Sequence, residues 1–174
     1  MAFDVFYQTM AQLCFTLLGL WWLVLQTQYA EWIGVRARRR MITNISLYFL
    51  LPGSMSLMAL LSSQVHFLWQ VAFLVASVLG AIETVVLMRG ARQNAPSMAL
   101  APVLSWLGFL LFVLVGLVAA LAFVPGMLSG LGIAPLGATG ILLTLVVVLG
   151  VTLAWAYFVQ PPTDLPARKA PGVE

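Results

Sequence analysis

The sequence predicts an all-α membrane protein, a polytopic bundle of five transmembrane helices, and three observations support this fold class. Only 7% of the 174 residues are charged, whereas soluble domains carry about a quarter. The mean hydropathy is +1.06. Residues 93–163 form a run of 71 residues without Lys, Arg, Asp or Glu, and residues 41–82 form a second run of 42. Uninterrupted apolar stretches of about 18 residues or more are typical of membrane spans.

The predicted spans cover residues 6–33, 41–62, 67–88, 98–124 and 136–159. At about 1.5 Å per residue, each can cross a hydrocarbon core of about 30 Å. Each must be helical because the bilayer offers no water to backbone groups. We therefore predict one transmembrane domain, residues 1–160, and a disordered cytoplasmic tail, residues 161–174.

The connections support these spans in chain order. The first span has no basic residue before it and no small-residue cleavage site after it, so we expect it to remain as a helix rather than be removed as a signal peptide. Residues 62–65 form a very short hairpin, which predicts that the second and third spans are antiparallel neighbours. Residues 89–96 form a polar loop, and residues 125–135 form an uncharged loop rich in Gly and Pro. Pro161 and Pro162 end the last span, because proline cannot continue a helix.

All eight basic residues fall on one side of this topology. They are Arg36, Arg38, Arg39, Arg40, Arg89, Arg92, Arg168 and Lys169. Basic residues near span ends stay in the cytoplasm. We therefore expect the N-terminus outside, the C-terminus in the cytoplasm, and a location in the plasma membrane, specifically a bacterial inner membrane. Topology alone explains the Arg36, Arg38, Arg39 and Arg40 cluster. Binding of anionic lipid headgroups, at about 1 kcal/mol per basic residue, is the alternative.

Glu83 lies inside the third span, where an ionised side chain costs about 2.5 to 3.5 kcal/mol. Ala72, Ala76 and Gly80 share its helix face within about 80°. Small residues mark faces where membrane helices approach closely, so Glu83 is predicted to point into the bundle or into a contact between subunits, and not at lipid. Polar residues of other spans, including Asn44 and Gln26, fall at a similar depth. This inner polar layer has two interpretations: hydrogen bonds that hold the helices together, or a site that handles ions or protons.

A polar stripe runs along the first span. Its members project within about 80° of one another and are Gln8, Gln12, Thr16, Gly19 and Gln26. In one interpretation the stripe lines a hydrated path at the axis of an oligomer, because five helices leave little room for a pore within one subunit. In the other it packs against the remaining four spans. Leu23 interrupts the stripe and would narrow any pore.

Several functional classes are not expected. The chain has one histidine, His66, and one cysteine, Cys14, so it cannot build a His/Cys zinc site or a bis-histidine haem site by itself. We therefore predict no metal and no cofactor. We also predict no enzymatic activity, because Glu83 and His66 lie at opposite membrane faces and cannot form a catalytic pair. The net charge of +3 is spread over short loops, which does not favour nucleic-acid binding. His66 remains a candidate titratable group at the outer interface.

Two function classes follow from these patterns. In the first, the protein is a small channel or transporter subunit that acts as a homo-oligomer. Gln12, Thr16, Gln26, Glu83 and Asn44 would then contribute to an intramembrane polar or ion pathway. In the second, the protein is a non-transporting scaffold or accessory subunit of a membrane complex, and the same polar residues only hold helices together. The predicted partners are the lipid bilayer, further copies of the chain and other membrane subunits.

Overall fold

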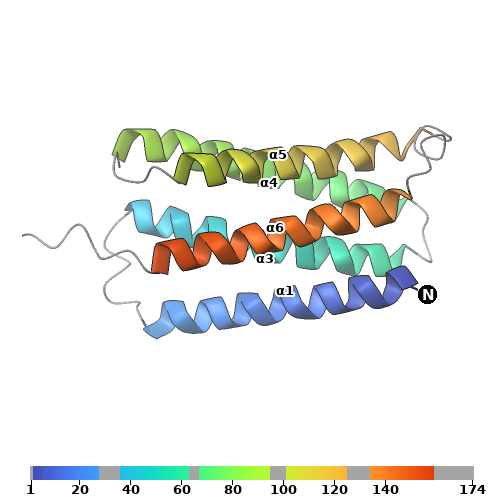
Figure 1. Ribbon diagram of the computed structural model, residues 1–174, viewed down its shortest axis with the longest axis horizontal. Helices are drawn as coiled ribbons and strands as arrows, with labels where there is room; N and C mark the ends of the chain where they lie inside the picture. Colours follow the sequence, from blue (N-terminus) through green and yellow to red (C-terminus); the bar gives the residue numbers. More distant parts are fainter. Residues whose placement is uncertain (1, 28–35, 63–66, 95–100, 125–133, 159–174) are drawn as a thin grey trace, which may run out of the picture.

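The computed structural model describes residues 2–27, 36–62, 67–94, 101–124 and 134–158. Over these residues the chain forms five α-helices (Figure 1). They are α1 (Ala2–Thr27), α3 (Arg36–Leu61), α4 (Leu68–Asn94), α5 (Ala101–Leu121) and α6 (Pro135–Phe158). All five are long and apolar enough to cross a membrane. The predicted fold class is confirmed, and the chain is an integral multi-pass membrane protein.

Three helices extend further than the hydropathy pattern predicts. α1 begins at Ala2 rather than at residue 6. α3 begins at Arg36 rather than at residue 41, and α4 continues to Asn94 rather than ending at residue 88. Hydropathy marks only the part of a helix that lies in hydrocarbon, whereas arginine is a good helix former and lets the helix continue into the headgroup region. The Arg36–Arg40 segment is therefore helical rather than a loop. The structure does not describe the predicted tail or residues 28–35, 63–66 and 125–133.

α3 is the central helix and α1 is the most peripheral. The apolar part of α3 is 56% buried within the chain, compared with 28% for α1. α1 packs against α3 and, less extensively, against α6, while α4 packs against α3 and α5. Figure 1 shows α1 along one edge of the bundle and α4 and α5 along the opposite edge. The predicted adjacency of the second and third spans is present in the contact between α3 and α4.

Tyr48 of α3 lies where α3 packs closely against both α5 and α6. The side chain is almost fully buried. A Cβ on Gly150 of α6 would lie 2.8 Å from the Tyr48 Cβ, and one on Gly108 of α5 would overlap the Tyr48 hydroxyl. Small residues let membrane helices approach closely, since van der Waals packing drives their association. Glycine at these two positions therefore provides the space that the tyrosine occupies.

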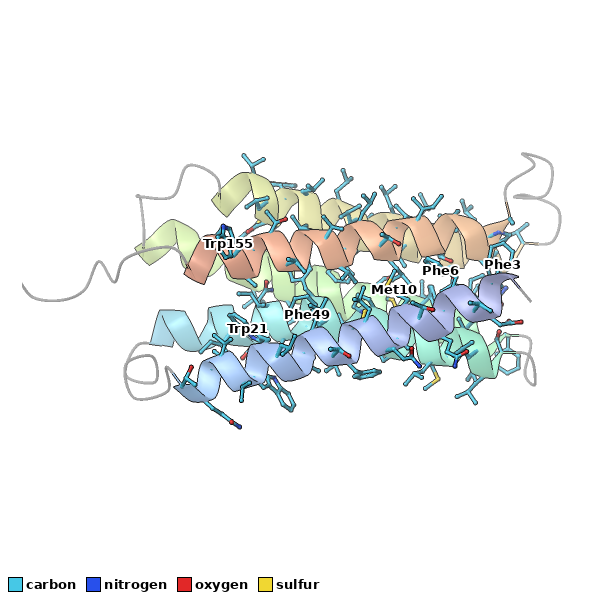
Figure 2. All side chains as sticks on the ribbon, turned by 60° about the horizontal axis from the view of Figure 1, so that its bottom comes forward. Phe3, Phe6, Met10, Trp21, Phe49 and Trp155 are labelled. Carbon is cyan, nitrogen blue, oxygen red and sulfur yellow. The ribbon has the colours of Figure 1, made fainter. Side chains whose placement is uncertain are left out.

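α1 is joined to α6 near the N-terminal ends of both helices. The Tyr7 hydroxyl donates a hydrogen bond to the Leu136 carbonyl at 2.7 Å and lies 3.0 Å from the Thr139 hydroxyl. Phe3 and Phe6 pack beside it, against Gly137 and Gly140 of α6. Figure 2 shows both phenylalanines at this end of α1, with Met10, Trp21 and Phe49 further along the bundle. This contact fixes the orientation of α1 about its own axis.

Candidate functional site

The buried face of α1 follows a regular spacing. Its members recur every three or four residues and are Tyr7, Met10, Ala11, Cys14, Leu18 and Trp21. Several of them pack with Ile45 and Phe49 of α3 and Val147 of α6. Since residues at this spacing share one face of a helix, everything on the other side of α1 points away from the chain.

The predicted polar stripe lies on that outward side. Gln12, Thr16 and Gln26 are exposed, as are Gln8 and Gly19. At about 100° per residue, Gln12 and Thr16 lie almost opposite the middle of the buried face. The stripe therefore does not pack against the other four helices, which was the second interpretation of the pattern. The signal that places it outward is the spacing of the buried residues, Tyr7 to Trp21, on the same helix.

The hydroxyl and amide groups of this face differ in their hydrogen bonds. Thr9 and Thr27 donate to backbone carbonyls of their own helix, those of Val5 and Val24. Within the part of the chain that the structure describes, the side chains of Gln8, Gln12 and Gln26 form no hydrogen bond with another helix. A neutral amide moved into an apolar medium without a partner costs several kcal/mol. The amide of Gln12, near the middle of α1, is therefore unfavourable in contact with acyl chains alone.

The outward faces of the opposite helices are different. On α5, every described exposed side chain is apolar: Val103, Trp106, Leu107, Leu110, Val113, Leu117 and Ala120. On α4, the exposed side chains between residues 71 and 86 are also apolar. Arg89 follows them at the end of the span. These faces suit lipid, because acyl chains offer no hydrogen bonds. The outward face of α1 does not suit lipid in the same way.

Gly19 is a second feature of the outward face of α1 that packing within the chain does not explain. A Cβ added at Gly19 would meet nothing within 4 Å. By contrast, one added at Gly53 of α3 would lie 3.1 Å from the Cys14 Cβ. Glycine in a helix interior costs about 1 kcal/mol relative to alanine. The fold of a single chain gives no packing reason for glycine at position 19.

Leu23 is the main apolar residue on the stripe. It lies within about 20° of Gln12 and Thr16 in projection and is 57% exposed. It stands between the polar groups of Thr16 and Gln26 along the helix. Trp22, also exposed, borders the stripe beside it. The stripe thus consists of neutral polar groups with one large aliphatic side chain among them, and Leu13 and Leu20 are exposed beside it.

Glu83 and Asn44 lie on other helices and do not join the outward face of α1. Glu83 is half-buried on α4, and Asn44 of α3 is only 4% exposed. Since α4 packs against α3 and α5 while the stripe faces away from α3, the five residues predicted for one pathway do not form one site. A similar depth in the membrane brings residues together only when their helices also face one another. Gln12, Thr16 and Gln26 remain together on α1.

The other residues singled out in the sequence are His66, the arginine cluster and Cys14. His66 lies outside the described residues, and so do the side chains of Arg36, Arg38, Arg39 and Arg40. Among the residues that are described, no group of three or more His, Cys, Asp or Glu side chains is placed to hold a metal ion. Cys14 is fully buried in the contact between α1 and α3.

Sequence reasoning missed two polar features of the interior. One is the Tyr7 contact with α6, which joins residues more than 120 positions apart and has no local signal. The other is a pair of buried side-chain atoms without a hydrogen-bond partner, Trp21 Nε1 and Ser77 Oγ. Ser77 lies against Gly116 of α5, where its small size matters more than its hydroxyl.

The chain was compared with protein-family models, with curated proteins and with solved structures, and no match was found in any of the three. The outward face of α1, defined by Gln8, Gln12, Thr16, Gly19, Leu23 and Gln26, is the candidate functional site of this multi-pass membrane protein.

Proposed function

We propose that the protein is a channel or transporter subunit that acts as a homo-oligomer, with the outward face of α1 turned toward the axis of the assembly. One observation carries the proposal: the exposed face of α1 holds Gln12, Thr16 and Gln26, whereas the exposed faces of α4 and α5 are apolar. Polar groups in the membrane face protein or a water-filled space rather than acyl chains. An axis surrounded by copies of α1 provides such a space.

The chemistry of the stripe favours copies of the same chain as neighbours. A glutamine amide both donates and accepts hydrogen bonds, so it is complementary to itself. Copies inserted in the same orientation place equal residues at equal depth, and Gln12 then meets Gln12 around the axis. A charged residue would repel its copies in this arrangement, and the stripe contains none.

The same chemistry determines what the path would accept. Amide oxygens replace water around cations, and amide hydrogens do so around anions or polar solutes. The proposed path therefore runs along α1 alone and carries small polar species without a fixed charge on its wall. Glu83 and Asn44 lie outside it. The proposal assigns no catalytic chemistry, metal or cofactor to the chain. It retains the orientation expected from the arginines, with the C-terminus in the cytoplasm.

A second candidate function is that of a scaffold or accessory subunit, in which the outward face of α1 binds another membrane protein. Trp22 and Leu23 favour it, because large exposed apolar side chains within a polar stripe suit a packed contact better than a hydrated wall. In that case Gln12 and Gln26 would hydrogen-bond to the partner, and no permeation would follow.

The test combines assembly with permeation. The purified protein is placed in lipid nanodiscs for native mass spectrometry, and in liposomes for potassium, chloride and glycerol flux. We expect an oligomer and flux above that of empty liposomes. The double variant Gln12→Leu/Gln26→Leu should remain assembled and lose flux. Thr152→Val is a matched control: Thr152 is exposed on α6 and bonds to its own helix at the Val148 carbonyl.

Each outcome decides between the candidates. An oligomer that passes none of the three probes contradicts the channel and favours the scaffold. A monomer in lipid contradicts the homo-oligomer. Flux that persists in the double variant excludes α1 as the path.

A further inference from the structure

The two flanks of the α1 stripe differ in shape. One flank carries Phe15, Gly19 and Trp22, and the other carries Leu13 and Leu20. Gln12, Thr16 and Leu23 lie between them. All of these residues are exposed on the single chain. We use this difference in shape to infer how neighbouring copies contact one another, and that inference rests on the homo-oligomer proposed above.

The first flank has a position without a side chain between two large ones. Phe15 precedes Gly19 by four residues and Trp22 follows it by three, so both lie one turn away on the same side of the helix. Nothing within 4 Å fills the space that a Cβ on Gly19 would occupy. The flank therefore presents a gap beside the exposed Trp22 ring, while the Phe15 ring on the other side of the gap packs partly against Gly53 of α3.

The second flank has the complementary shape. Leu13 and Leu20 are seven residues apart and thus lie on one side of α1, two turns from each other. They are 48% and 54% exposed, so each projects from the surface. Leu20 is adjacent to Gly19 in sequence. In parallel copies it therefore lies within about 1.5 Å of the depth of the gap on a neighbour.

We infer that neighbouring copies meet through these unlike flanks, with Leu20 of one copy inserted beside Gly19 of the next, between Phe15 and Trp22. A glycine at such a contact lets two helix backbones approach closely, which is how membrane helices gain packing energy. This contact supplies the packing reason for Gly19 that the single chain does not.

The arrangement of the flanks determines the kind of assembly. Gly19 and Leu20 are separated by about 100° around the helix. Contacts between unlike surfaces at less than 180° turn successive copies about an axis, and copies held at one depth in the bilayer form a ring when that rotation closes. The face between the flanks points to that axis. The inferred contact therefore places Gln12, Thr16 and Leu23 toward the centre of the ring and Gln26 at the edge of the path, beside the first flank. One chain alone cannot complete the site.

A first experiment enlarges the glycine. In Gly19→Leu the new side chain fills the gap, and its Cβ meets no atom of its own chain within 4 Å, so the circular dichroism and the unfolding midpoint of the monomer in detergent should not fall. Native mass spectrometry in nanodiscs should show at least a tenfold loss of oligomer. Ala120→Leu adds bulk to the exposed face of α5 and should assemble like the wild type.

A second experiment tests the unlike pairing directly. In a Cys14→Ala background, Gly19→Cys and Leu20→Cys are made separately, and each chain is oxidised alone and after mixing. We expect disulfide-linked dimers only in the mixture, because each flank meets the other kind. Cross-linking of either variant alone to the same extent contradicts unlike flanks and indicates a symmetric contact.

The results separate this inference from the proposed function. If the wild type is oligomeric and Gly19→Leu assembles equally well, the inferred contact is wrong while the homo-oligomer remains. If the wild type is monomeric in lipid, both are wrong. Loss of oligomer in Ala120→Leu as well as in Gly19→Leu also contradicts the inference, because the effect would not be specific to α1.

Discussion

Gly80 of α4 lies against the ring of Phe112 of α5, so closely that a Cβ on the glycine would be 2.6 Å from two ring carbons. Phe112 is almost fully buried and also packs against Tyr48 of α3, with ring centroids 5.6 Å apart. The ring is held on two sides and has little room to move. The α4–α5 contact therefore depends on the absence of a side chain at position 80.

We predict that Gly80→Ala destabilises the chain by about 1 to 3 kcal/mol, the usual effect of an extra methyl group in a filled core. The measurement is unfolding in mixed micelles with increasing dodecyl sulfate, followed by circular dichroism. Gly19→Ala is the control. It should leave stability unchanged or raise it slightly, since alanine favours the helix and meets no neighbour. Equal effects of the two variants would contradict the packing described for both glycines.

A second prediction concerns the contact of α1 with α6. Tyr7→Phe removes the donor to the Leu136 carbonyl and the contact with Thr139, but keeps the ring that packs against Phe73. We expect a loss on the order of 1 kcal/mol in the same unfolding assay, as for other hydrogen bonds between membrane helices. Because the contact orients α1, the variant should also weaken assembly.

A double-mutant cycle with Thr139→Val isolates the Tyr7–Thr139 term from the contribution of the Leu136 carbonyl. If the two substitutions have strictly additive effects, the hydroxyl pair does not interact. Thr152→Val should have little effect, since its exposed hydroxyl bonds only to its own helix.

The sequence was sufficient to predict five membrane helices, because charged residues are missing over such long segments that no other fold could hold them. It also predicted the α1 stripe, since Gln12, Thr16 and Gln26 repeat at helical spacing. It could not determine what the stripe faces. A polar face is equally suited to neighbours within the chain and beyond it, and the choice depends on how Tyr7, Cys14 and Trp21 pack. Glu83 was grouped with the stripe by depth alone, and depth does not specify which helices are adjacent.

A third prediction follows from the separation of Glu83 from α1. Glu83→Gln should leave potassium, chloride and glycerol flux within about twofold of the wild type, because α4 lies on the opposite edge of the bundle (Figure 1). Gln12→Leu, in the same liposomes, should reduce flux at least tenfold. A change in the ratio of potassium to chloride flux caused by Glu83→Gln would show that the path includes α4, and the proposed route along α1 would then be incomplete.

The last prediction concerns Leu23. In a ring with the outward face of α1 at its axis, Leu23 side chains from all copies converge between the polar layers of Thr16 and Gln26. Narrow apolar constrictions empty of water readily and block permeation without closing sterically. Leu23 would therefore be the narrowest point of the path and limit its flux without closing it.

Leu23→Ser should raise flux several-fold, because a hydroxyl at the constriction lets water remain there. Leu145→Ser is the matched control: Leu145 is exposed on α6, on a face that the proposal leaves in lipid, and flux should not change. Liposome flux for the two variants is compared at equal amounts of assembled protein. If Leu23→Ser conducts no better than the wild type while Gln12→Leu still abolishes flux, the path is correct but its narrowest point lies elsewhere. If both leucine variants raise flux alike, the increase comes from a disturbed bilayer, and the constriction at Leu23 is excluded.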